Sequence, residues 1–204
     1  MPPARNESRE LLERLIAERN EHPERLAEID RRIWDAFGAT HAVWVLDMCG
    51  FSRLTMRYGI THFLGMIQRL HGLVRPIVVA NGGTVVKTEA DNVFAVFGDV
   101  GPALATARDL QSRLAAANAY LPEDWDLHTS IGIGWGEVLM IGDDDFYGNE
   151  LNIASKLGED VAGPGEVYLT EAAHGRLLAT GGAPGERREI PISTMVVIAH
   201  LLVG

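Results

Sequence analysis

Residues 42–52 read Ala42-Val-Trp-Val-Leu-Asp47-Met-Cys-Gly50-Phe-Ser52, a hydrophobic run that stops at an acidic residue and a glycine. The hydrophobic part predicts a buried strand, and the glycine predicts a tight turn into the next element. An unpaired charge beside a hydrophobic core is costly. An acid in this position therefore needs a reason other than packing, and a bound cation is one.

A second acid stands in a similar place. Asp91 opens the stretch Asp91-Asn-Val-Phe-Ala-Val-Phe97 and follows the run Gly83-Thr-Val-Val-Lys87. Both stretches predict strands, so Asp47 and Asp91 are expected on neighbouring strands. Mg²⁺ is commonly held by one or two carboxylates together with substrate phosphates. Phosphate chemistry is therefore the first functional hypothesis.

The composition is that of an ordinary globular domain, with 204 residues, of which 47% are hydrophobic and 23% charged. Cys49 is the single cysteine, which excludes an internal disulfide and a cysteine-based zinc cluster. The net charge of −10 argues against nonspecific nucleic-acid binding, because such binding depends on a surplus of Lys and Arg. With no signal peptide and no apolar run of membrane-spanning length, the chain is expected to be cytoplasmic, without a membrane segment.

The hydrophobic pattern divides the chain near residue 40. Residues 8–36 predict helix, with a break at His22-Pro23. This N-terminal helical segment, residues 1–40, is expected either to pack on the main domain or to serve as a dimerising or signal-coupling element. Residues 41–204 form the main domain.

Strands and helices alternate in the main domain. Helices are predicted at residues 61–79, 102–119 and 150–157, and strands at residues 42–47, 84–88, 92–97, 128–134, 137–141, 166–169 and 195–203. Strands in hairpins with helices on one face predict an α+β fold rather than a doubly wound parallel sheet.

The glycine turn that ends the first strand is suited to phosphate. Backbone N–H groups at the start of a helix can hold phosphate oxygens, and Gly50 permits a close approach. Ser52 is expected as the N-cap of the following helix. The alternative is an ordinary strand–helix turn with a capping serine.

Two further pairs of polar residues stand out. Lys87 and Asp91 flank the predicted hairpin 88–90, so they either face different clefts or form a surface ion pair of little energy. Asn152 and Lys156 are four residues apart, which places them on one face of a helix. Asparagine is a poor residue for a helix interior, so Asn152 is either functional or a local cap.

Together these stretches resemble the class III nucleotidyl cyclases, the adenylyl and guanylyl cyclase catalytic domains. Three blocks in the family's order carry the resemblance: Asp47-Met-Cys-Gly-Phe-Ser52, Gly82-Gly-Thr-Val-Val-Lys-Thr-Glu-Ala-Asp91 and Asp145-Phe-Tyr-Gly-Asn-Glu-Leu-Asn-Ile-Ala-Ser-Lys156. The resemblance implies a cyclase catalytic domain over residues 41–204. Its expected fold is a ferredoxin-like or palm-like α+β fold, with helices packed on an antiparallel-rich sheet.

The resemblance also implies a site with two divalent metal ions, Mg²⁺ or Mn²⁺. Asp47 and Asp91 match the family's metal-binding aspartates, and Met48 beside the first is expected to join them. In the general two-metal scheme, the ions stabilise the attacking and the leaving oxygens. Three turn residues are expected to contact the substrate: Gly50, Phe51 and Ser52.

ATP is the substrate that the resemblance implies. Lys87 and Asp145 match the family's residues that read the adenine edge, and Asn152 matches the asparagine that orients the ribose. Four residues further on, the family normally has an arginine that stabilises charge at the α-phosphate. Lys156 stands there in this chain, and it keeps the charge but lacks the planar fork of donors.

The family's sites lie between two catalytic domains, and this chain carries both sets of residues. A homodimer with two equivalent sites is therefore expected, acting as an adenylate cyclase that converts ATP to cyclic AMP and pyrophosphate. Two alternatives stay open: a cyclase that uses GTP or a pyrimidine nucleotide, and a degenerate cyclase-like domain that binds nucleotide or a partner without turnover. Lys156 motivates the second, as does the lack of the family's C-terminal phosphate lysine, for which Arg187 or Arg188 is a candidate substitute.

Overall fold

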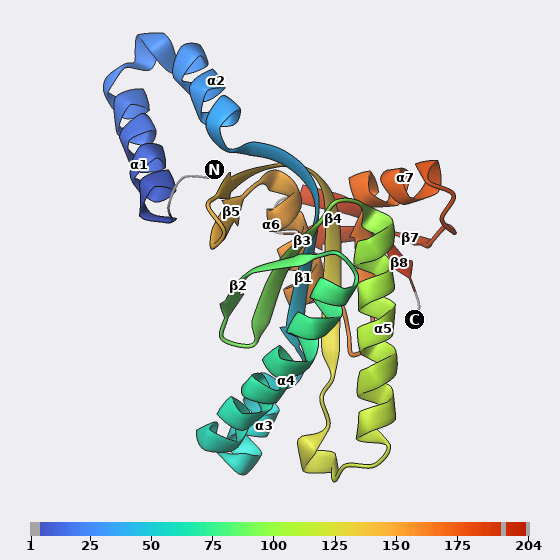
Figure 1. Ribbon diagram of the computed structural model, residues 1–204. Coiled ribbons are helices and arrows are strands. Elements are labelled where there is room, and N and C mark those ends of the chain that lie inside the picture. The colour runs from blue at the N-terminus through green and yellow to red at the C-terminus, as the bar shows by residue number, and fades with distance from the viewer. Residues whose placement is uncertain (1–4, 193–194, 203–204) are drawn as a thin grey trace.

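The structure, a computed structural model, describes residues 5–192 and 195–202 (Figure 1). One eight-stranded sheet has the order β2-β3-β1-β4-β6-β8-β7, and β5 pairs with β4 outside this path. The strands are β1 Gly38–Met48, β2 Thr84–Glu89, β3 Asn92–Phe97, β4 Thr129–Ile141, β5 Asp145–Tyr147, β6 Val167–Thr170, β7 Glu186–Ile192 and β8 Met195–Leu202. The helices are α1 Arg5–Glu21, α2 Leu26–Phe37, α3 Phe51–Tyr58, α4 Ile60–Ala80, α5 Val100–Asn118, α6 Asn149–Lys156 and α7 Glu171–Ala179, with short helical turns at η1 Pro23–Arg25, η2 Glu123–Trp125 and η3 Leu157–Val161.

The predicted α+β class is confirmed, because β4 and β6 pair in parallel while the other described pairs are antiparallel. The expectation of helices on one face is wrong. Trp44 and Leu46 of β1 are buried toward α4 and α5, whereas Val43 and Val45 are buried toward α6. A continuous hydrophobic run is typical of a strand that is covered on both faces, so the run at residues 43–46 already indicated helices on both faces of the sheet.

Strand β4 is one continuous strand, whereas the sequence predicted two strands interrupted near residue 135. Three alternating glycines of β4, Gly132, Gly134 and Gly136, lie under α6 instead of forming a turn. A Cβ on Gly132 would lie 2.0 Å from the carbonyl oxygen of Ala154. Here glycine serves the close approach of a helix to the sheet, which is a second common use of glycine in strands.

The N-terminal helices α1 and α2 form a hairpin that packs on the end of β4. Leu15 and Ile33 are buried there with Ile141. The predicted break is confirmed, because α1 ends at Glu21 and η1 follows. This packing agrees with the first of the two expectations for the segment, and the boundary at residue 40 stays a prediction. No helix in the described part of the chain is both long and apolar enough to cross a membrane.

Two strands were not predicted, β5 and β7. Charged residues dominate the first half of β7, which reads Glu-Arg-Arg-Glu before Ile190, and they conceal the hydrophobic alternation. Charges are common on edge strands because they discourage pairing with other chains. Strand β7 lies at the opposite edge of the sheet from β2.

Candidate active site

Asp47 and Asp91, the acid pair, lie near each other at the ends of their strands. Asp47 is the penultimate residue of β1, and Asp91 lies in the turn directly before β3, which begins at Asn92 as predicted. Its neighbour Ala90 takes the left-handed conformation that this tight turn requires, with φ 51°. Burial, followed by the charges of Asp91 and Glu159, raises the pKa of Asp47 to about 7.

The acid pair has no lysine or arginine partner in the described part of the chain, and the charge of His71 only partly offsets the effect of burial on Asp91. Among the described side chains, no Lys or Arg forms an ion pair with Asp47 or Asp91. Burial also raises the pKa of Asp91, so both carboxylates resist ionisation in the folded chain. A bound cation would relieve the repulsion between them, which fits the predicted metal site.

The donors are few for a metal site formed by protein alone. Within the described residues, no group of three or more His, Cys, Asp or Glu side chains is arranged to hold a metal ion. Two carboxylates fit Mg²⁺ that also binds substrate phosphates, because Mg²⁺ usually keeps such a mixed shell. Met48 is 2% exposed and packs in the core, so its side chain is not available to a cation, and its predicted metal role would fall to its backbone.

The turn after the acid begins helix α3. Gly50 is its N-cap, with φ 93°, and no side chain caps the helix. The prediction of Ser52 as N-cap is therefore wrong, because α3 already begins at Phe51. Glycine takes this left-handed conformation at little cost, which is why it occupies the corner. The side chains of Phe51 and Ser52 lie outside the described set, and phosphate binding by this turn stays a prediction.

Lys87 and Asp145 meet in a second cluster, the Lys87–Asp145 cluster, which also contains Glu89 and Tyr147. The Lys87 Nζ atom lies 3.1 Å from Asp145 Oδ1 and 2.7 Å from Glu89 Oε1. A bulge between Val85 and Lys87 sets this register on β2, and bulges often re-aim side chains near active sites. The suggested ion pair between Lys87 and Asp91 is wrong, because Lys87 pairs elsewhere.

Asp145 is held firmly at the start of β5. The next residue, Phe146, is fully buried and anchors the strand. The Tyr147 hydroxyl donates to Asp145 Oδ2 at 2.7 Å. Burial opposes ionisation of Asp145, but Tyr147 and Lys87 outweigh it and lower the pKa of Asp145. The carboxylates of Glu89 and Asp145 outweigh the effect of burial on Lys87 and raise the pKa of its ammonium group.

Helix α6 carries the third group of predicted residues. Glu150 fixes the helix to the sheet, since its Oε2 accepts from Thr170 Oγ1 at 2.6 Å and from the Trp135 N–H at 3.2 Å. Asn152 and Lys156 are both exposed, as expected for one helix face. Lys156 Nζ lies 2.8 Å from Asp160 Oδ2, so the cation that replaces the family's arginine is already paired.

Comparison with known proteins agrees with the fold, although models of protein families give no match. The chain is 34% identical over 134 residues to a Rhizobium meliloti protein named as an adenylate cyclase, a match that covers 65% of this chain and 22% of that protein. It is 30% identical over 157 residues to an adenylate cyclase of Streptomyces coelicolor, covering 76% of this chain and 37% of the relative. The crystal structure of an adenylate/guanylate cyclase/hydrolase from Silicibacter pomeroyi resembles it with a TM-score of 0.70 and 24% identity, over 82% of this chain and 98% of the other.

Sequence and fold therefore point to one family. The chain belongs to the class III nucleotidyl cyclase family. It spans 22% and 37% of the length of the two curated relatives, so less than half of either is matched. The named activities are those of the relatives.

Two residues near the cyclase site were missed by the sequence reasoning. Tyr147 lies inside the third block, where its spacing from Asp145 along one strand face was the available signal. Arg9 of α1 reaches Asp145 Oδ2 at 3.4 Å, and no local pattern connects residues this far apart. Arg187 and Arg188, the suggested phosphate cations, pair with glutamates of their own strand β7.

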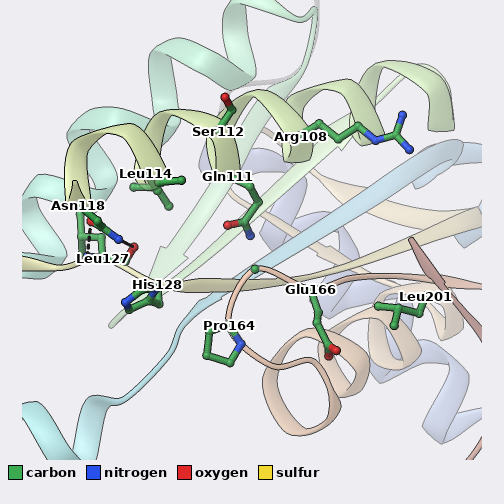
Figure 2. A pocket seen from close by; sticks show the side chains of 12 residues that line it. Arg108, Gln111, Ser112, Leu114, Asn118, Leu127, His128, Pro164, Glu166 and Leu201 are labelled. Atoms are coloured by element: carbon green, nitrogen blue, oxygen red, sulfur yellow. Dashed lines mark hydrogen bonds between the residues drawn. The ribbon is translucent and has the colours of Figure 1, made fainter. Parts of the chain in front are cut away.

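A cavity of about 720 Å³ lies away from all of these residues, between α5 and the loop that precedes β6 (Figure 2). Gln111 of α5 lines one side and Glu166 the other, over an apolar floor that includes Leu114. The predicted site residues do not line it.

Proposed function

We propose that two copies of this chain convert ATP to 3′,5′-cyclic AMP and pyrophosphate. The observation that carries the proposal is the grouping of Lys87 with Asp145 in one cluster and of Asp47 with Asp91 in another. A lysine donor beside a carboxylate acceptor matches the N1 acceptor and exocyclic amine of adenine. Guanine presents a carbonyl oxygen where adenine has the amine, and that oxygen would face the Asp145 carboxylate.

In the proposed reaction, the ribose 3′-oxygen attacks the α-phosphorus and forms the new O–P bond. The bond to the bridging oxygen breaks, pyrophosphate leaves, and the hydroxyl proton passes to solvent. Mg²⁺ or Mn²⁺, two per site, would be held by Asp47 and Asp91 and would supply charge neutralisation and a more acidic hydroxyl. Asn152 would orient the ribose, and Lys156 would approach the α-phosphate after leaving Asp160.

The proposed assembly is a homodimer in which each site combines the acid pair of one copy with the Lys87–Asp145 cluster of the other. The separation of Lys87 from Asp91 supports this arrangement, because residues only four positions apart serve different groups of partners. A two-fold axis then produces two equivalent sites. The cytoplasmic location stays a prediction.

The test is to incubate the purified protein with ATP, GTP, CTP or UTP plus Mg²⁺ or Mn²⁺, and to identify the products by mass spectrometry. Cyclic AMP as the main product is expected. No cyclic product under any condition would overturn the proposal. For the shared sites, Asp47→Ala and Lys87→Ala chains are co-expressed with different tags. Purified mixed dimers should regain about half of one wild-type dimer's activity, because one of their two sites is intact.

The second candidate is nucleotide binding without turnover, and the ion pair between Lys156 and Asp160 favours it. A paired lysine must break its contact before it can stabilise charge on a phosphate. A non-cyclisable ATP analogue that binds in calorimetry, together with no cyclic product from any nucleotide, would support this candidate. Cyclic GMP or a cyclic pyrimidine nucleotide as the main product would instead identify a different base preference.

A further inference from the structure

The carboxylate of Asp145 has four donors. Its Oδ1 accepts from the Phe146 N–H at 2.9 Å and pairs with Lys87 Nζ at 3.1 Å. Its Oδ2 accepts from the Tyr147 hydroxyl at 2.7 Å and from Arg9 at 3.4 Å. An ionised carboxylate offers about four lone-pair positions, so Asp145 is saturated in the folded chain. An incoming amine therefore has to displace a donor.

The donors on Oδ2 are unequal. Tyr147 belongs to the same short strand as Asp145 and makes the shorter hydrogen bond, so it fixes the rotation of the carboxylate. Arg9 comes from α1, makes the longest of the four contacts, and its side chain is 48% exposed. Because Lys87 and the Phe146 N–H hold Oδ1, the position that opens most easily for a ligand is the one Arg9 takes on Oδ2.

Arg9 and an adenine amine use the same chemistry. Each presents a planar N–H donor to the carboxylate oxygen, and the guanidinium has the added attraction of its charge. Helix α1 keeps Arg9 close, because Ser8 beside it is 3% exposed and Leu15 is buried in the hairpin core. The contact is therefore maintained in the absence of nucleotide and is broken by withdrawal of a single side chain.

We propose that Tyr147 and Arg9 are further residues of the base site with opposite effects: Tyr147 is a positioning residue that fixes Asp145 to accept from a 6-amino purine, and Arg9 competes with that amine for Oδ2. The inference rests on the proposed function, since it assumes that Asp145 contacts the base. It makes the N-terminal hairpin a determinant of nucleotide affinity. It also makes Tyr147 a determinant of the choice between adenine and guanine.

The test compares Arg9→Ala and Tyr147→Phe with matched controls. Arg14→Ala removes an exposed arginine from the same helix, and Tyr120→Phe removes a hydroxyl from a tyrosine that is 91% exposed. Arg9→Ala should lower the KM for ATP about threefold with kcat unchanged, as expected for loss of an exposed ion pair. Tyr147→Phe should raise the KM for ATP about tenfold and lower the ATP/GTP ratio of kcat/KM by a similar factor, as expected for a hydrogen bond to a charged group. Arg14→Ala and Tyr120→Phe should leave every constant unchanged.

A purely structural role for the two residues gives a different result. In that case, Arg9→Ala would leave the KM unchanged or raise it, and Tyr147→Phe would leave the ATP/GTP ratio unchanged, and either outcome overturns the inference. The affinity of a non-cyclisable ATP analogue, measured by calorimetry, separates this failure from failure of the proposed function. Analogue binding with equal affinity in wild type and Arg9→Ala overturns the inference alone. Absence of analogue binding in wild type overturns both.

Discussion

The acid pair and the Lys87–Asp145 cluster are each centred on aspartates at strand ends, but their charges are handled in opposite ways. In the acid pair, neither carboxylate has a lysine or arginine partner among the described side chains, and burial raises the pKa of both. In the Lys87–Asp145 cluster, every acceptor of Asp145 is occupied and the pKa of Asp145 is lowered. The acid pair is therefore completed by what binds to it, while the Lys87–Asp145 cluster is complete until a ligand displaces one of its donors.

The largest effect is expected from removing one member of the acid pair. Asp91→Asn should lower cyclic AMP formation about a thousandfold, because loss of a metal-binding carboxylate removes several kcal/mol of charge stabilisation. Turnover is measured at saturating Mn²⁺ and ATP. Asp143→Asn, an exposed change in the turn between β4 and β5, is the control and should retain full turnover. Equal turnover in Asp91→Asn and the control would refute the role of the acid pair.

A smaller effect with a different signature is expected in the Lys87–Asp145 cluster. Asp145→Asn should lower the ATP/GTP ratio of kcat/KM about ten- to a hundredfold, because the amide presents both a donor and an acceptor to the base. Metal dependence should stay unchanged. A fall in turnover with ATP and GTP alike, at a constant ratio, would show that Asp145 does not read the base. The Lys87–Asp145 cluster would then no longer differ from the acid pair in function.

Local patterns in the sequence were enough to predict the acid pair and the face of α6. The end of β1 is marked by a hydrophobic run, and Asn152 and Lys156 follow from helical spacing. Glycines were ambiguous: the predicted interruption at residues 135–136 included Gly136, but Gly136, like Gly132 and Gly134, provides room for α6 to lie on the sheet. This distinction depends on what packs above the strand, which single-residue patterns do not record.

The saturation of Asp145 could not be predicted, for a similar reason. One of its donors, Arg9, lies 136 positions away in the chain, and the contact exists only because the N-terminal hairpin folds onto the end of β4. Gly50, and not Ser52, is the N-cap of α3 because the chain takes a left-handed conformation at Gly50, which the residue types alone did not indicate. Residue types identified the chemistry, while the fold decided which groups are already satisfied.

Lys156 shares the character of the Lys87–Asp145 cluster, because it too is paired before any ligand arrives. Lys156→Arg should raise kcat about three- to tenfold, since the planar fork can bind a phosphate with two parallel hydrogen bonds. Lys156→Ala should lower kcat more than it changes the KM for ATP. Arg113→Lys, an exchange in an exposed ion pair with Asp109, is a control without expected effect. A turnover number that is the same in Lys156→Ala and wild type would exclude Lys156 from the reaction.

The last effect is on stability rather than on activity, and it distinguishes the acid pair from the Lys87–Asp145 cluster by its sign. The pKa of Asp47 is higher in the folded chain than its ordinary value of 3.8, so the folded state binds more protons, and Asp47 costs stability as the pH rises from about 4 to about 7. Asp47→Asn should therefore gain free energy of unfolding over this range. A tenfold change in a proton-binding constant corresponds to about 1.4 kcal/mol, so the full shift would give about 4 kcal/mol. Solvent screening of this half-buried carboxyl reduces the gain expected at pH 8 to roughly 1–3 kcal/mol. The pKa of Asp145 is lowered, so Asp145 stabilises the fold above its unfolded pKa and loses this contribution as the pH falls.

Urea unfolding in EDTA at pH values from 4 to 8 measures both slopes without metal. The free energy of unfolding of Asp47→Asn relative to wild type should increase with pH, and that of Asp145→Asn should decrease with pH. Parallel curves for Asp47→Asn and wild type would mean that the acid pair is not held under repulsion. The acid pair and the Lys87–Asp145 cluster would then differ only in what they bind, and not in the direction in which folding shifts the pKa of their carboxylates.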